Sequence, residues 1–194
     1  MKKDVVIIGA SDVGISAALR IRELDPSLKP LVIADNNFPN FSICGIPFFI
    51  GGEVVESSNL AHRKKKDLKN AGMELLLETR VEKIIPEKKK IIAVNAEGRQ
   101  EIYYEKLVLG TGGVNIEPPI SGLELPEVFF MRWMDDALAC DNFIKKNQPQ
   151  KAAVIGGGYV GLEMADALSK RGLKVTVIEF MDSILTTVNL KFRK

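Results

Sequence analysis

Cysteine, histidine and long hydrophobic runs are all scarce in this sequence of 194 residues. It contains two cysteines and one histidine. Two cysteines do not make a disulfide framework, so a reducing cytoplasm is the expected location, and no metal site is expected. No apolar run approaches the length of about 20 residues that a membrane span needs. A net charge of +2 provides no large basic field, which argues against nucleic acid or an anionic membrane as a partner.

One pattern of strand, glycine turn, helix and strand occurs twice in the chain. The first copy reads DVVIIGA, then a helix over residues 12–24, then the strand PLVIAD. The second copy reads KAAVIGGG, then a helix over 159–171 followed by Gly172, then the strand LKVTVIE. Each copy is typical of a βαβ unit with parallel strands and a right-handed crossover. We therefore expect an α/β protein with two Rossmann-like dinucleotide-binding units.

The stretch between the two copies differs from both of them. Residues 73–94 read as two strands, a turn at 86–89 and a third strand, and a further strand is expected over 106–110. These strands predict a β-meander insertion on the first unit. The proline-rich residues 118–126 predict a hinge, so the expected domains are 1–117 and 118–194.

The second glycine turn matches the dinucleotide-binding fingerprint G-x-G-x-x-G at Gly156, Gly158 and Gly161. The first glycine allows the tight turn, the second lets a pyrophosphate approach the backbone, and the third lets helix and strand pack closely. Glu179 ends the next strand, where an acid accepts hydrogen bonds from a ribose diol and repels a 2′-phosphate. The sequence therefore predicts NADH as the ligand, in preference to NADPH.

The first glycine turn is a variant of the same fingerprint. Ser11 replaces the middle glycine between Gly9 and Gly14. Serine is small, so a phosphate can still come close to the backbone. Asp35 ends the second strand, where the ribose-binding acid belongs. Two dinucleotide units in one chain suggest two dinucleotides.

Four stretches in the same order resemble a known family: VVIIGASDVG, SICGIPFFIGG, LVLGTGG, and AVIGGGYVGLEMADAL with VTVIE. They are similar to the flavin-dependent pyridine nucleotide-disulfide oxidoreductases. Within that family they resemble the single-cysteine branch of NADH oxidases, NADH peroxidases and coenzyme A-disulfide reductases. The resemblance implies the three-layer FAD/NAD(P)-binding fold, with FAD on the first unit and NADH on the second.

The resemblance also implies the binding residues of both units. For FAD they are Gly9, Ser11, Asp12, Gly14, Asp35, Asn36, Ser42, Val81, Thr111 and Gly112. For NADH they are Gly156, Gly158, Tyr159, Val160, Gly161 and Glu179. Tyr159 matches a tyrosine that covers the nicotinamide side of the flavin, and Glu163 matches an acid near the isoalloxazine. The alternatives are helix packing for Tyr159 and an ordinary surface acid for Glu163.

Cys44 is the candidate catalytic residue. The two-cysteine branch of the superfamily has C-x-x-x-x-C, but here the fifth position after Cys44 is Phe49, and Cys140 in DDALACDNF is interpreted as a core residue. Cys44 would therefore work alone, cycling between a thiolate and an oxidised form. Pro47 suits the first turn of a helix, and the positive end of that helix would favour the thiolate. Inert packing of Cys44 is the alternative.

The expected activity is transfer of a hydride from NADH to FAD and on to Cys44, which reduces a small disulfide, persulfide or polysulfide. The resemblance leaves two other flavoprotein activities open, NADH oxidase or peroxidase and NADH:ferredoxin or rubredoxin reductase. The oxidases and peroxidases carry a histidine where this chain has Asp12. His62 is expected at the surface.

Two further expectations concern the rest of the protein. Family members continue with the remainder of the FAD domain and a dimerisation domain, so we expect a truncated chain or part of a longer homodimeric protein. A catalytically inactive nucleotide-binding fragment is the alternative of another class.

Overall fold

The computed structural model describes residues 1–186, and the terminal stretch NLKFRK lies outside them. The chain divides into two compact units. Unit 1 contains residues 1–41 and 61–114, and unit 2 contains residues 42–60 and the chain from Asn115 onward. The segment that carries Cys44 therefore belongs to the same unit as the second glycine turn. The domain limits 1–117 and 118–194 stay a prediction.

Unit 1 is built on a six-stranded sheet in the order β3-β2-β1-β6-β5-β4. The strands are β1 (Lys2–Ile8), β2 (Leu31–Ile33), β3 (Glu74–Leu76), β4 (Arg80–Ile85), β5 (Lys90–Asn95) and β6 (Gly98–Leu109). β3, β2, β1 and β6 are parallel neighbours, whereas β6, β5 and β4 form an antiparallel meander. The meander begins one strand later than expected, because β3 pairs with β2 and belongs to the parallel sheet.

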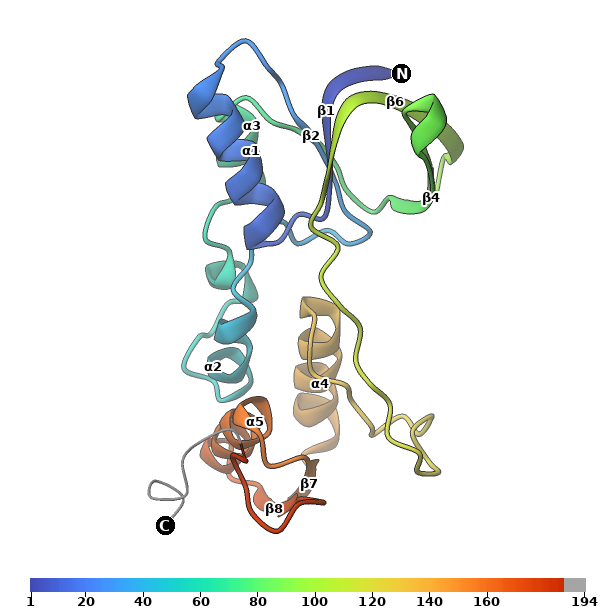
Figure 1. Cartoon of the computed structure of the whole chain (residues 1–194). Helices are drawn as coiled ribbons and strands as arrows, with labels where there is room; N and C mark the ends of the chain where they lie inside the picture. Colours follow the sequence, from blue (N-terminus) through green and yellow to red (C-terminus); the bar gives the residue numbers. More distant parts are fainter. Residues whose placement is uncertain (187–194) are drawn as a thin grey trace. The chain divides into compact units, whose positions relative to one another are not determined.

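The central strand β1 is buried on both faces, as its continuous apolar run predicts. Val5 and Ile7 share a core with Ile15 and Ala18 of α1 (Asp12–Leu24), and with Leu68 of α3 (Lys65–Asn70). On the other face, Val6 and β2 pack against side chains of β5 and β6. Figure 1 shows α1 beside β1 and β2, and the green β4–β6 region curling away from it. The result is the expected three-layer arrangement.

Arg22 of α1 corrects one expectation from helical periodicity. Helical spacing over residues 12–24 predicts that Arg20, Arg22 and Glu23 face solvent. The Arg22 side chain is instead half-buried, and its guanidinium donates to the carbonyl oxygens of Ala71 and Leu28, at 3.0 and 2.7 Å. A long cationic side chain can lie along the protein and satisfy carbonyls of a neighbouring segment. Arg20 and Glu23 are exposed, as expected.

Unit 2 contains the second βαβ unit. β7 (Lys151–Ile155) and β8 (Lys174–Ile178) pair in parallel, with α5 (Tyr159–Lys170) between them in sequence. Gly172 follows α5 with φ +86°, a conformation that favours glycine at the end of a helix. α4 (Met134–Asn147) and the short α2 (Ile46–Ile50) complete the unit, and α2 packs against both α4 and α5.

Among residues 1–186, no helix is long and apolar enough to cross a membrane.

Candidate functional site

The two glycine turns have the same backbone geometry. The N–H of Gly9 donates to the carbonyl of Ile33 at 2.8 Å, and the N–H of Gly156 donates to the carbonyl of Ile178 at the same distance. Their φ angles are +109° and +107°, a region that side chains rarely adopt. Each turn therefore connects its strand to its helix in the way that the repeated sequence pattern predicts.

The last glycine of each turn lies against the first one. A Cβ added at Gly14 would lie 1.9 Å from the carbonyl oxygen of Gly9, and a Cβ at Gly161 would lie 1.9 Å from that of Gly156. No side chain fits at such a distance. Helix and strand can pack this closely only because both positions are glycine.

The middle position explains why Ser11 can replace a glycine. Ser11 has φ −76° and ψ −175°, and Gly158 has φ −79° and ψ −174°. Both are extended conformations that any residue can adopt. Serine therefore changes the size of this position without changing the turn.

Both turns fit the pyrophosphate of a dinucleotide. Ser11 and Gly158 are the N-cap residues of α1 and α5. The first N–H groups of a helix have no partner within it, and the helix dipole makes that end positive. Such an end binds phosphate groups. The residues present are thus suited to two dinucleotides, one on each unit.

Gly110 is a residue of the first turn that the sequence interpretation missed. A Cβ at Gly9 would lie 2.0 Å from the carbonyl oxygen of Gly110, and the N–H of Gly110 donates to the carbonyl of Ile8 at 2.7 Å. The backbone after β6 therefore presses on the glycine turn. The stretch LVLGTGG contains Gly110, but its resemblance to the family predicts only Thr111 and Gly112 as binding residues, and both of these are exposed.

The other residues predicted for FAD lie at separate places. Asp35 is exposed just after β2, and the Asn36 side chain accepts the N–H of Phe38 at 3.0 Å. Val81 lies on β4, an edge strand of the sheet, which pairs with β5 on one side and with no other strand of residues 1–186. An edge of this kind can hydrogen-bond an adenine through the backbone. Ser42 lies in unit 2 with Cys44.

Glu179 lies beside the second glycine turn, where a ribose-binding acid is expected. Its carboxylate accepts the N–H of Gly157 at 2.6 Å and the N–H of Met181 at 2.9 Å. The N–H groups of Met181 and Gly157 hold the pKa of this carboxyl below its ordinary value. The acid is therefore ionised and fixed against the turn that is suited to a pyrophosphate.

Three residues at the start of α5 lie at its surface. Tyr159 and Val160 have exposed fractions of 60% and 55%, and Glu163 is exposed as well. Tyr159 and Glu163 are four residues apart, so they share one face of the helix. Because Tyr159 is so exposed, it contributes little to packing within unit 2, and its ring is available for contact with a ligand.

Cys44 is exposed in a short 3₁₀ turn, Ile43–Gly45, directly before α2. Pro47 lies in the first turn of α2, as its fixed φ favours. Gly45 packs closely against Leu60 beside the cysteine, because a Cβ there would lie 2.6 Å from Leu60 Cδ2 and the leucine would have to shift. Ile46, Phe49 and Ile50 bury the opposite side of this segment. The thiol is thus displayed at the surface of unit 2 by a firmly packed helix.

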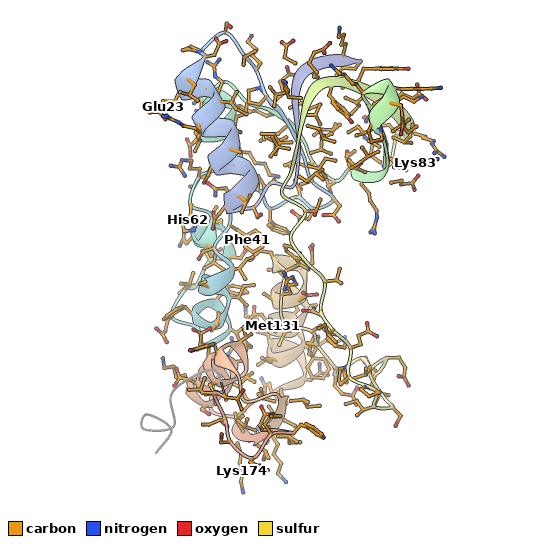
Figure 2. All side chains as sticks on the ribbon, in the orientation of Figure 1. Glu23, Phe41, His62, Lys83, Met131 and Lys174 are labelled. Atoms are coloured by element: carbon orange, nitrogen blue, oxygen red, sulfur yellow. The ribbon has the colours of Figure 1, made fainter. Side chains whose placement is uncertain are left out.

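The two ends of the segment that carries Cys44 are hydrogen-bonded to each other through their backbones. The N–H of Ser42 donates to the carbonyl of Leu60 at 2.7 Å, and the N–H of His62 donates to the carbonyl of Asn40 at 2.8 Å. A β-bridge joins Phe41 and Ala61 between them. Figure 2 shows Phe41 and His62 near each other at this place. The His62 side chain is exposed, as expected.

Cys140 is buried on α4 and belongs to the core of unit 2, as predicted. Burial, with a smaller contribution from Asp141, raises the pKa of its thiol to about 11. A thiol of this kind stays protonated and is a poor nucleophile. Of the two cysteines, only Cys44 is exposed to solvent.

In the part of the chain that the structure describes, no group of three or more histidine, cysteine, aspartate and glutamate side chains could bind a metal ion.

Two glycine turns of equal geometry, each followed by a helix and by a strand with an acid shortly after its end, are typical of a protein that binds two dinucleotides. Residues 3–194 match the family model described as "Pyridine nucleotide-disulphide oxidoreductase". The chain belongs to this family, and the family and its relatives imply FAD and NAD(P)H as the cofactors.

Three relatives illustrate the range of the similarity. An NADH oxidase of Methanocaldococcus jannaschii is 34% identical over 182 residues, which cover 93% of this chain and 41% of the relative. A coenzyme A disulfide reductase of Staphylococcus aureus is 32% identical over 184 residues, with coverage of 93% and 41%. The solved structure of a NAD-dependent persulfide reductase from A. fulgidus is 32% identical with a TM-score of 0.92, and covers 100% of this chain and 36% of that one. The chain thus spans about two fifths of the length of these relatives.

Proposed function

We propose that this chain is the cofactor-binding part of a flavoprotein that passes a hydride from NADH to FAD, and the electron pair on to Cys44. Cys44 then reduces a small disulfide, persulfide or polysulfide. The observation that carries this proposal is the contrast between the two cysteines, because Cys44 is exposed while Cys140 is buried in the core. Relatives named as a coenzyme A disulfide reductase and a persulfide reductase support the choice of substrate.

The protein's own residues contribute binding and nucleophilic attack. The first glycine turn would hold the pyrophosphate of FAD and the second that of NADH, with Asp35 and Glu179 on the riboses. When bound, FAD supplies the hydride chemistry that no side chain can supply. Tyr159 and Glu163 would lie on the side from which the nicotinamide approaches.

The disulfide step balances as follows. The Cys44 thiolate attacks one sulfur of a disulfide RSSR, which forms a mixed disulfide with Cys44 and releases one thiolate RS⁻. The electron pair that originates from NADH then cleaves the mixed disulfide, which releases the second RS⁻ and restores the Cys44 thiolate. One NADH is oxidised for each disulfide, and protons from water convert the two products to thiols.

The preference for NADH over NADPH rests on the end of β8. Glu179 is ionised there, and the next three residues, Phe180, Met181 and Asp182, include no cation that could bind a 2′-phosphate. A carboxylate that binds the ribose diol repels that phosphate. The ratio of kcat/KM for NADH and NADPH measures this preference.

An NADH oxidase is the second candidate, because the relative from M. jannaschii carries that name. In that case, oxygen would accept the electrons.

We also propose that the whole protein is cytoplasmic and forms a homodimer. Light scattering of the whole protein measures its oligomeric state.

The test compares Cys44→Ser with Cys140→Ser as the matched control. The protein is reconstituted with FAD and titrated with NADH without oxygen, and the visible spectrum is recorded. Turnover of a small disulfide should be lost in Cys44→Ser and kept in Cys140→Ser. Disulfide turnover that survives Cys44→Ser contradicts the mechanism. In a separate assay with oxygen present, NADH consumption without any added disulfide favours the oxidase. A protein that stays colourless after reconstitution favours the inactive fragment.

A further inference from the structure

Arg171, at the end of α5, makes a buried connection to the helix that follows Cys44. Its Nη1 donates to the carbonyl oxygen of Ile50, the last residue of α2, at 2.9 Å. The same Nη1 donates to Oδ1 of Asp141 on α4, also at 2.9 Å. One guanidinium group therefore joins α2, α4 and α5.

The pair formed by Arg171 and Asp141 is shielded from water. The Asp141 side chain has an exposed fraction of 5%, and that of Arg171 is 19%. An ion pair at the surface contributes little to the stability of the folded protein, but a buried charge that loses its partner destabilises it strongly. Lys145 occupies the other oxygen of Asp141 at 2.6 Å, but its own side chain is 62% exposed. Because Lys145 pairs with the same carboxylate from the surface, it provides a natural comparison for Arg171.

The end of α2 also packs directly on α5. A Cβ added at Gly51 would lie 3.5 Å from Ala167 Cα, an ordinary van der Waals distance, so the backbone at the end of α2 lies close to α5. The Ile50 carbonyl lies at the C-terminal end of α2, where a cation is favoured by the helix dipole. Arg171 therefore fixes the position of α2 along α5 as well as its distance from it.

We propose that Arg171 is a positioning residue for Cys44: by holding the end of α2 against α5 and α4, it fixes the exposed thiol relative to the helix that carries the second glycine turn. This inference rests on the proposed function, in which Cys44 must receive electrons that originate at the NADH unit. A displacement of about 1 Å can lower the rate of such a step by about 100-fold. α2 is short, with bounds Ile46–Ile50, so a shift at its end is transmitted to Cys44.

The test separates turnover that needs Cys44 from turnover that does not. Arg171→Ala, Arg171→Lys and the control Lys145→Met are compared in the FAD-loaded protein, first with a small disulfide and then with ferricyanide, which takes electrons without a thiol. Arg171→Ala should lower kcat with the disulfide by about 10- to 100-fold and leave the KM for NADH and ferricyanide turnover unchanged. Arg171→Lys should recover only part of the loss, because an amine can donate to both acceptors but lacks the rigid planar guanidinium that fixes their positions. Lys145→Met should behave like the unaltered protein.

The outcomes also separate this inference from the proposed function. A parallel loss of disulfide and ferricyanide turnover in Arg171→Ala would make the role merely structural and overturn the proposal. If that variant does not fold, the ratio of the two turnovers in Arg171→Lys decides: a ratio below that of Lys145→Met supports the proposal, and an equal ratio overturns it. If Cys44→Ser keeps disulfide turnover, the proposed function is wrong. If Cys44→Ser loses it while Arg171→Ala keeps it, only the role of Arg171 is wrong.

Discussion

Gly158→Ala should weaken NADH binding without weakening the fold. A Cβ at Gly158 meets nothing within 4 Å, and its φ of −79° suits alanine. Replacing glycine by alanine at a compatible position stabilises the folded state by about 0.4–1 kcal/mol, because alanine lowers the conformational entropy of the unfolded chain. Alanine is a poorer N-cap than glycine by a similar amount of about 0.5–1 kcal/mol. The two effects oppose each other, so the free energy of unfolding should change by less than about 0.5 kcal/mol.

The same methyl group should interfere with NADH, because the middle glycine is the one that a pyrophosphate approaches. We expect the Kd for NADH to rise at least about tenfold, which corresponds to about 1.4 kcal/mol. Gly161→Ala on the same helix is the contrasting variant. Its Cβ would lie 1.9 Å from the Gly156 carbonyl oxygen, and such overpacking typically costs about 1–3 kcal/mol of stability.

Chemical denaturation gives the free energy of unfolding of both variants, and calorimetric titration gives the Kd. If Gly158→Ala binds NADH as tightly as the unaltered chain, the pyrophosphate does not approach the backbone at this turn. If Gly158→Ala loses as much stability as Gly161→Ala, the inference that a methyl group fits beside Gly158 is wrong. Either result refutes the reasoning.

The pKa shifts of Cys140 and Glu179 lead to three further predictions. Burial raises the pKa of Cys140 from 9.0 to about 11, so iodoacetamide at pH 8 should label Cys44 and leave Cys140 unmodified until guanidinium unfolds the chain. Mass spectrometry of peptides measures the labelling of each cysteine. Equal labelling of both cysteines in the native protein would contradict this prediction. The folded state also holds the Cys140 proton more tightly than the unfolded state does, so this thiol should make stability fall as the pH rises from 9 towards 11, and Cys140→Ser should remove that part of the fall. The pKa of Glu179 is lowered from 4.5 by the N–H groups of Met181 and Gly157, so its contribution to stability is complete above pH 4.5 and is lost as the pH falls through the lowered pKa. Thermal unfolding between pH 3 and 7 should therefore show a smaller acid loss for Glu179→Gln than for the unaltered chain, and identical profiles would contradict this.

Local patterns predicted much of the fold, because each element has a local cause. The helix α1 has the bounds that its periodicity gave, and the strands β1, β7 and β8 follow from short β-branched runs that end at glycine or an acid. The partner of β3 could not be predicted in this way. Its apolar residues favour a strand, but whether it joins the parallel sheet or the meander depends on contacts far away in sequence.

In the candidate site as well, features with a local cause could be predicted and features that depend on long-range contacts could not. The glycine turns could be predicted because the positive φ of the first position and the close packing of the last one both select glycine. Gly110 was missed because its role depends on the approach of β6 to Gly9 across the sheet. Arg171 and Asp141 were missed as well, since 30 residues separate them and neither lies in a motif.

The paired backbone at residues 40–42 and 60–62 makes the segment between them a closed loop with fixed ends. The entropy cost of such a loop grows only slowly with its length, and its ends are held by their own hydrogen bonds. Residues can therefore be inserted, removed or exchanged around Cys44 with little effect on the sheet that carries the first glycine turn. Under the proposed function, in which Cys44 reacts with the electron acceptor, changes confined to this loop would alter the acceptor and leave the sheet of unit 1 as it is.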